Sequence, residues 1–223
     1  MMNAICRVSP RMSVWAAAFS IALCASAAAQ TDATPLSRAL AKLDLGVSGI
    51  GVLTPSNSGN NLFNQSVSSV PTNTLGALIE LRYTKSPLIG FELNYSYARY
   101  NDTFNVGAQP PYQFASQSKV NEYSMGYVAH GPELAGFKTF GGVGVGAIEF
   151  KPTTGGGQGL PPEVRTGFYY TVGVDKPLFS DSFGLRAFFR QTFYGAVDFN
   201  ENYLATGARS ITTEPGVGFY LRF

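Results

Sequence analysis

Cysteine, histidine and long apolar runs are scarce in this chain of 223 residues. Its two cysteines, Cys6 and Cys24, lie among the first 29 residues, and His130 is the single histidine. After residue 29 no apolar run is long enough to cross a bilayer as a helix. No cluster has metal-ligand spacing, and the stretch 195–207 lacks the oxygen-ligand spacing of an EF-hand loop. We therefore expect no metal and no cofactor.

The first 29 residues have the pattern of a secretory signal peptide. Arg7 and Arg11 precede an apolar run over 14–29 that ends in small residues at an Ala-x-Ala site. This pattern predicts a signal peptide over 1–29, cleaved after Ala29. A lead segment over 30–42, either a brief helix or a flexible stretch, would follow it.

Two other interpretations of the N-terminal segment are a membrane-anchoring helix and lipoprotein processing at Cys24. The apolar run is short for an anchor, and Leu23 stands where lipoprotein sites carry a small residue. Removal of 1–29 takes away both cysteines, so the mature chain would form no disulfide. It also leaves 14 basic residues against 14 acidic ones. A balanced charge without a basic patch argues against nucleic acid as a partner.

From residue 43 onward, large apolar side chains alternate with small or polar ones, and this period of two predicts β-strands. The runs are about ten residues or more in length, enough for a tilted strand to cross a membrane. They cover 43–53, 74–83, 90–100, 121–130, 137–150, 164–174, 183–194 and 214–223. Long polar connections are expected at 54–73, 101–120, 151–163 and 195–212. Short ones, each with one proline, are expected at 84–89, 131–136 and 175–182.

This arrangement predicts an all-β protein, an eight-stranded antiparallel transmembrane β-barrel over 43–223. Hydrocarbon offers no hydrogen-bond partner, so every backbone polar group of a spanning sheet must be paired within the protein. A sheet meets this condition only when it closes. Eight strands enclose an interior just wide enough for side chains. Long loops at one end and short turns at the other are typical of outer-membrane barrels. We expect the bacterial outer membrane as location, outer-membrane lipid as a partner, and pairing of the last strand with the first.

The final run, EPGVGFYLRF, alternates Val217, Phe219, Leu221 and Phe223 with small or polar residues. With the signal peptide, the eight amphipathic strands and the alternating loop lengths, it makes the chain resemble the OmpA/OmpX-type small outer-membrane barrels across nearly all of 43–223. The resemblance implies that these four residues form an assembly signal, which the outer-membrane assembly machinery recognises.

Several charged residues fall on the inward side of the expected strands. Burial of a lone ion costs several kcal/mol, so charges in a narrow barrel must pair. They are predicted to form a structural salt-bridge network that fills the lumen, although a selectivity lining of a narrow pore is the alternative. These residues are Glu80, Arg82, Glu92, Glu122, Arg165, Arg186, Arg190 and Arg222.

Two further features of the sequence resemble enzyme signals. His130 is expected beside a short periplasmic turn, the wrong end for a lipid A deacylase or an omptin-type protease, and is therefore interpreted as a turn residue. Gly142-x-Gly144-x-x-Ala147 superficially matches a dinucleotide fingerprint, but a strand continues where that motif needs a helix. These glycines are expected to make room for Tyr169 and Phe188. We predict no catalytic residue.

The loops carry aromatic residues that can anchor a partner or pack against neighbouring loops, and the sequence leaves both possibilities open. The resulting prediction is a non-enzymatic outer-membrane protein with a structural or surface-interaction role, with a possible extracellular ligand. A narrow pore is the alternative, and a lipid-modifying barrel enzyme is a third. The aromatic residues are Phe63, Phe104, Tyr112, Phe114, Phe199 and Tyr203.

Overall fold

The structure is a computed structural model that describes residues 39–180 and 182–223. The predicted signal peptide and most of the lead segment lie outside the described residues. The chain divides into a unit over 44–222 and a second unit that holds residues 1–43 and Phe223. Among the described residues, no helix has the length and apolar character needed to cross a membrane.

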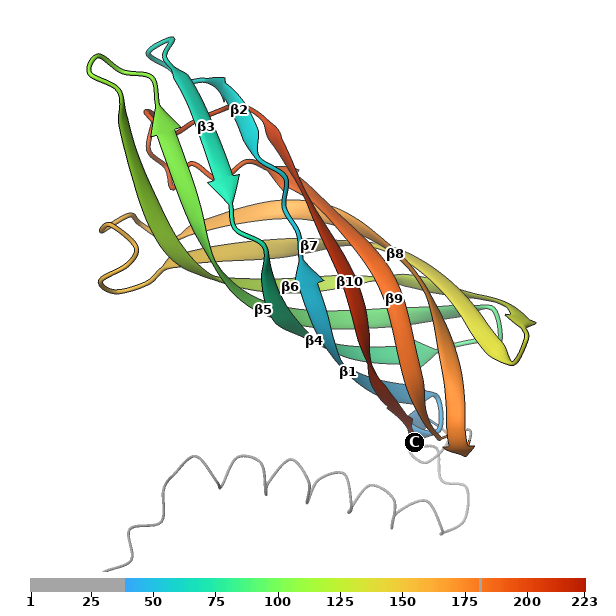
Figure 1. Ribbon diagram of the computed structural model, residues 1–223. Helices are drawn as coiled ribbons and strands as arrows, with labels where there is room; N and C mark the ends of the chain where they lie inside the picture. Colours follow the sequence, from blue (N-terminus) through green and yellow to red (C-terminus); the bar gives the residue numbers. More distant parts are fainter. Residues whose placement is uncertain (1–38, 181) are drawn as a thin grey trace, which may run out of the picture. The chain divides into compact units, whose positions relative to one another are not determined.

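The 44–222 unit is a β-barrel built from one antiparallel sheet (Figure 1). Eight strands close the ring in the order β1, β4, β5, β6, β7, β8, β9, β10, and β10 pairs with β1. β2 and β3 continue the sheet from the far part of β5. The strands are β1 (Leu43–Val52), β2 (Asn57–Asn60), β3 (Ser66–Pro71), β4 (Thr74–Thr84), β5 (Ile89–Val106), β6 (Tyr112–Leu134), β7 (Phe137–Pro152), β8 (Glu163–Ser180), β9 (Phe183–Gly195) and β10 (Arg209–Arg222).

Residues that alternate in the sequence point alternately into the lumen and out of the barrel wall. Along β5, for example, Glu92 and Asn94 are buried while Leu93 and Tyr97 are exposed, because successive side chains of a strand point to opposite faces. The predicted eight-stranded barrel and the pairing of its last strand with its first are thus confirmed.

A continuous band of exposed apolar side chains surrounds the barrel wall, and we call it the apolar belt. Exposed apolar surface of this extent marks a surface that faces lipid or a partner, and a barrel in a bilayer needs such a band. The belt includes Leu45, Val47, Leu75, Ile79, Leu81, Leu93, Tyr97, Tyr123, Met125, Tyr127, Val143, Val145, Phe168, Val172, Phe189, Val217 and Phe219.

The strands extend further than the sequence pattern indicated. The expected first loop contains the β2–β3 hairpin, and most of the expected second loop is strand, so that only residues 107–111 join β5 to β6. At the opposite end, β6 continues to Leu134 and β8 to Ser180, leaving tighter turns than predicted. Beyond the apolar belt a strand no longer needs an apolar outer face, so alternation fades while backbone pairing continues. We call the end with β2 and β3 the loop end and the other the turn end.

Glycines in the barrel wall make room for large inward side chains. A Cβ at Gly144 would lie 2.5 Å from the Tyr169 ring, and one at Gly126 would lie 2.5 Å from its hydroxyl. The predicted space for Tyr169 is therefore confirmed at Gly144. Phe188 instead lies against Gly216, where an added Cβ would approach its ring to 2.3 Å.

Candidate functional site

Arg186 is the centre of an ion network in the lumen near the turn end. Its guanidinium, on β9, donates two hydrogen bonds to Asp175 of β8, from Nε to Oδ1 and from Nη2 to Oδ2, each at 2.8 Å. The same guanidinium lies 3.0 Å from Glu80 of β4 and 3.4 Å from Asp44 of β1. Its side chain is 0% exposed, so this forked pairing takes place away from solvent, where such bonds are strongest.

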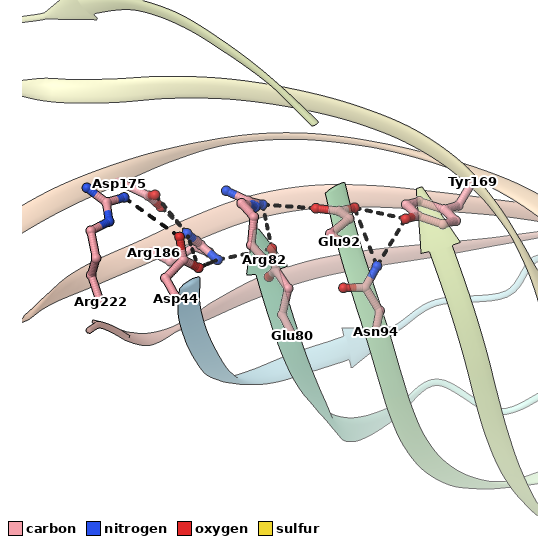
Figure 2. Close-up of polar contacts among 9 residues, drawn as sticks. All are labelled: Asp44, Glu80, Arg82, Glu92, Asn94, Tyr169, Asp175, Arg186 and Arg222. Carbon is pink, nitrogen blue, oxygen red and sulfur yellow. Dashed lines mark hydrogen bonds and ion pairs between the residues drawn. The ribbon is translucent and has the colours of Figure 1, made fainter. Parts of the chain in front are cut away.

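Arg82 extends this network across the barrel (Figure 2). It forms ion pairs with Glu80 on its own strand and with Glu92 of β5, the latter at 3.1 Å. The Tyr169 hydroxyl donates to Glu92 at 2.8 Å. The Phe140 ring centre lies 4.3 Å from the Arg82 guanidinium carbon. A cation over an aromatic face is a favourable contact that shields this buried charge.

A second cluster surrounds Arg190. This residue forms an ion pair with Glu122 of β6, donates to the Ser124 hydroxyl at 2.8 Å and lies 3.8 Å from Glu214 of β10. Its guanidinium carbon lies 4.1 Å from the centre of the Tyr169 ring. Since Tyr169 also donates to Glu92, it connects the two clusters into one network.

Six of the eight predicted lumen residues are buried and lie in this network: Glu80, Arg82, Glu92, Glu122, Arg186 and Arg190. Arg222 lies at the edge of the network, 3.7 Å from Asp44 and 30% exposed. Arg165 does not join it. It pairs with Glu163 and, at 2.9 Å, with Asp198 of the fourth loop, because it stands near the loop-end start of β8.

Four network members were missing from the predicted set, namely Asp44, Asp175, Glu214 and Tyr169. All four occupy the inward parity of strands that the sequence pattern had already located. Asp175 falls in the expected turn 175–182, and extending the alternation of β8 by one step identifies it as inward-facing. With them, the network holds six carboxylates (Asp44, Glu80, Glu92, Glu122, Asp175 and Glu214) and four guanidiniums (Arg82, Arg186, Arg190 and Arg222).

The loop end of the lumen is filled in a different way, by an apolar cluster that we call the plug. It combines side chains from β3, β5, β7 and β9 with three residues of the fourth loop. Between the plug and the Arg190 cluster lies a cavity of about 20 Å³, bordered by Tyr100, Glu122 and Glu214, which is room for about one water molecule. The plug consists of Val67, Tyr100, Phe104, Val106, Ile148, Phe150, Tyr194, Val197, Phe199 and Leu204.

Polar contacts tie the loops down around the plug. The Glu163 carboxylate accepts hydrogen bonds from the backbone N–H groups of Phe199 at 2.6 Å and Asp198 at 3.1 Å. Burial raises the pKa of Glu163, against these hydrogen bonds and Arg165, which favour the ionised form. The Ser69 hydroxyl donates to Asp102 at 2.7 Å. Burial raises the pKa of Asp102 to about 6.

The six loop aromatics divide into two groups. Phe104 and Phe199 are buried in the plug, and Phe114 and Tyr203 pack against it. Phe63 is 64% exposed and Tyr112 is 44% exposed, although Tyr112 stacks on Phe114 at 6.4 Å between ring centres. Packing accounts for the first group and leaves Phe63 and Tyr112 as the exposed ones.

The remaining predicted residues lie as follows. His130 is half-buried on the inward parity of β6, opposite Phe140, and is a strand residue because β6 continues past it. In the predicted assembly signal, Val217 and Phe219 are exposed on the apolar belt, Leu221 is half-buried, and Phe223 belongs to the second unit. Within the described ranges, no group of three or more His, Cys, Asp or Glu residues could hold a metal ion.

No protein-family model matches the chain, and no curated protein matches it in sequence. Solved structures do resemble it. The outer membrane protein OprG from Pseudomonas aeruginosa is 13% identical, with a TM-score of 0.55 over 81% of this chain and 95% of that one. Neisserial surface protein A is 14% identical, with a TM-score of 0.51 over 80% of this chain and 97% of that one.

At these identities the similarity concerns the fold. It agrees with the closed ring of eight strands and with the apolar belt on its outer wall. The chain thus has the fold of the small eight-stranded β-barrel proteins of the bacterial outer membrane.

Proposed function

We propose that this barrel is a non-enzymatic outer-membrane protein that interacts with partners at the cell surface through its loop end. The filled lumen is the observation that carries this proposal. The ion network occupies the turn-end half and the plug fills the loop end, so among residues 39–180 and 182–223 side chains fill the lumen at both levels, with a cavity of about 20 Å³ between them. What remains open to a partner is the outer surface of the loop end.

That surface has a defined chemistry, and we call it the tip surface. The β2–β3 turn exposes Leu62 and Phe63, which are 75% and 64% exposed. A backbone hydrogen bond of 2.7 Å from Gly107 to Ser66 joins this hairpin to the β5–β6 hairpin. Exposed aromatic anchors beside polar groups are typical of binding surfaces. The tip surface also includes a groove of about 340 Å³ lined by Ser66, Ser68, Asn105, Val106, Gly107, Pro111, Tyr112 and Gln113.

Because no lining residue of this groove carries a charge, we propose partners that present an uncharged surface. Charge–charge attraction then contributes little, and binding should change little with salt concentration.

Binding at the tip surface can be tested with the protein in DMPC nanodiscs, using an array of neutral glycans as probes. The Phe63→Ser/Tyr112→Ser variant should lose binding. Tyr127→Ser/Phe168→Ser, which removes two exposed aromatics from the apolar belt, serves as the matched control and should retain it. Binding to none of these probes, or equal loss in both variants, would refute the proposal.

The narrow-pore alternative can be tested separately by planar-bilayer conductance. The filled lumen predicts no steady conductance for the unmodified protein. Steady conductance that changes its ion selectivity on Arg190→Gln substitution would favour the pore instead. A lipid-modifying enzyme would be favoured by loss of a lipid modification on gene deletion that a single-residue variant fails to restore.

A further inference from the structure

Three exposed basic residues lie side by side on neighbouring strands of the outer wall. Arg99 of β5 is directly opposite Lys119 of β6, and Lys119 is directly opposite Lys151 of β7. All three are exposed. We call this set the basic rung.

Such an arrangement is unfavourable for the barrel alone, because like charges directly opposite each other on neighbouring strands destabilise a sheet. One carboxylate offsets part of the charge, since Glu149 pairs with Lys151 at 2.8 Å. Arg99 donates to the neutral amide oxygen of Gln117. Lys119 has no ion pair within residues 39–180 and 182–223. Three cations with one carboxylate leave a positive site that an anion can occupy.

The basic rung stands at the loop-side edge of the apolar belt. One outward position closer to the turn end, β5 carries the belt residue Tyr97. On β6, Lys119 is separated from the belt residue Tyr123 by the polar Asn121. On the loop side of the rung, the next outward residue of β5 is the polar Asn101. This border is the level at which lipid headgroups meet a barrel, and lysine and arginine reach it with their long stems along the wall.

Below the basic rung, the same strands enclose a hollow in the belt that we call the wall groove. Its volume is about 870 Å³, within the range of roughly 300–1,000 Å³ usual for ligand pockets. The small outward residues Ala147 and Thr166 lie directly opposite each other on β7 and β8 between larger neighbours and account for the hollow. The lining is Leu93, Asn94, Tyr123, Ser124, Met125, Val145, Gly146, Ala147, Thr166, Gly167, Phe168 and Phe193.

The spacing of the two features fits one amphiphile. Lys119 and Tyr123 are four residues apart on β6, a rise of roughly 13 Å in a strand, with Asn121 on the same face between them. The Asn121 side chain accepts from the Tyr95 hydroxyl at 3.1 Å and donates to Glu149 at 3.4 Å. The cations of the basic rung match a phosphate, and the Asn121 amide matches a glycerol or sugar unit. The apolar wall groove matches an acyl chain.

We propose that the basic rung and the wall groove together form a binding site for a phosphorylated lipid, with its phosphate at the rung and an acyl chain in the groove. The site depends on the barrel facing lipid and is independent of the tip surface. Lipid binding at this site can therefore be present or absent whatever the loops bind.

Native mass spectrometry of the detergent-purified protein, titrated with purified lipid A, phosphatidylglycerol or phosphatidylcholine, tests this site. We expect lipid A and phosphatidylglycerol to be retained more than zwitterionic phosphatidylcholine. Lys119→Gln/Lys151→Gln should weaken their binding roughly 10- to 30-fold, because each cation near a lipid phosphate contributes about 1 kcal/mol. The matched control, Lys85→Gln/Arg209→Gln, removes two exposed cations elsewhere and should bind as the unmodified protein does.

Two single variants separate this site from a general attraction to charge. Glu149→Gln removes the carboxylate and should strengthen lipid A binding, an effect that a structural role of the rung would not produce. Ala147→Trp fills the groove and should weaken lipid binding without touching the charges. The heat-dependent gel shift of each variant shows whether its barrel is folded.

Equal loss in the Lys119/Lys151 variant and its control would overturn the proposal. A second result would also overturn it. If inorganic phosphate displaces the bound lipid as strongly as lipid A does, and Ala147→Trp leaves lipid binding unchanged, the basic rung is a site for free anions. Tighter binding in Glu149→Gln together with weaker binding in Ala147→Trp would support a lipid site.

Discussion

The two halves of the lumen are filled by opposite chemistry. At the turn end, four arginines and six carboxylates from seven strands form ion pairs in the lumen. At the loop end, an apolar plug assembles from strands and loop residues. The ion network depends on attraction between buried opposite charges, so removal of one member leaves its partners buried with less compensation. The plug depends on contact area, so truncating one member has a local cost. The barrel thus combines a part that tolerates little change with a part that can be adjusted.

The largest effect is expected when the centre of the ion network is removed. Arg186→Met should destabilise the barrel by about 3–5 kcal/mol, because Asp44, Glu80 and Asp175 lose their shared cation. Urea unfolding in DMPC vesicles, followed by the heat-dependent gel shift, measures this. Arg222→Met is the control and should cost less than about 1 kcal/mol, since that pair is partly exposed. Similar losses in both variants would contradict the central role of Arg186.

Truncation within the plug should open the loop end and leave the barrel closed. Phe104 is fully buried and contacts Phe114 and Phe199 with ring centres 5.4 and 6.0 Å away, so Phe104→Ala should cost about 3–4 kcal/mol locally. We expect faster protease cleavage in 61–65 with an unchanged gel shift. If the gel shift disappears as readily as in Arg186→Met, the two halves do not differ as described.

The loop end should also depend on pH, through Asp102. Its pKa of about 6 lies above the usual value near 3.8, so the folded state binds this proton more tightly than the unfolded state does. The resulting stabilisation is fully present below about pH 4 and is lost as the pH rises through 6. It amounts to about 3 kcal/mol. Amide hydrogen exchange in β3, compared at pH 5 and 7.5 after correction for intrinsic rates, should show weaker protection at the higher pH. Asp102→Asn should abolish the difference, and its persistence in that variant would exclude Asp102 as the source.

The smallest effect is expected at the connection between the two ion clusters. Tyr169→Phe removes the hydroxyl that donates to Glu92 and accepts from Asn94 but retains the ring beside Arg190. The expected loss is about 1–2 kcal/mol. In a double-mutant cycle with Arg190→Met, the two losses should be non-additive, whereas Arg222→Met should add to Tyr169→Phe independently.

Period-two alternation was sufficient to predict the ring, its eight strands and most of the ion network. A strand with a lipid-facing side fixes the side of every residue, so Glu80, Arg186 and Arg190 had to point inward. The same rule covers Asp44, which lies on the polar face of the expected strand 43–53 but is absent from the predicted set. It also covers Asp175, because β8 continues past the expected start of the turn at 175.

The plug could not be predicted in this way. Val67, Phe104 and Leu204 come together only after β3, β5 and the fourth loop have taken their places, and such contacts have no local period. The polar β2 and the far parts of β5 and β6 were missed for a related reason. Outside the apolar belt their pairing depends on backbone hydrogen bonds and on contacts such as Ser69 to Asp102, which leave no apolar alternation in the sequence.

The length of the β5–β6 hairpin has a consequence for how this protein evolves. Paired strands of 18 and 23 residues carry the tip away from the bilayer as a stiff stalk, so their length determines the height at which a partner is met. Deleting or inserting residues two at a time in each strand would change that height in steps of roughly 7 Å and keep every side chain on its original face. Inserting or deleting a single residue would move every side chain that follows it to the opposite face of the strand. Relatives should therefore differ in stalk length by even numbers of residues.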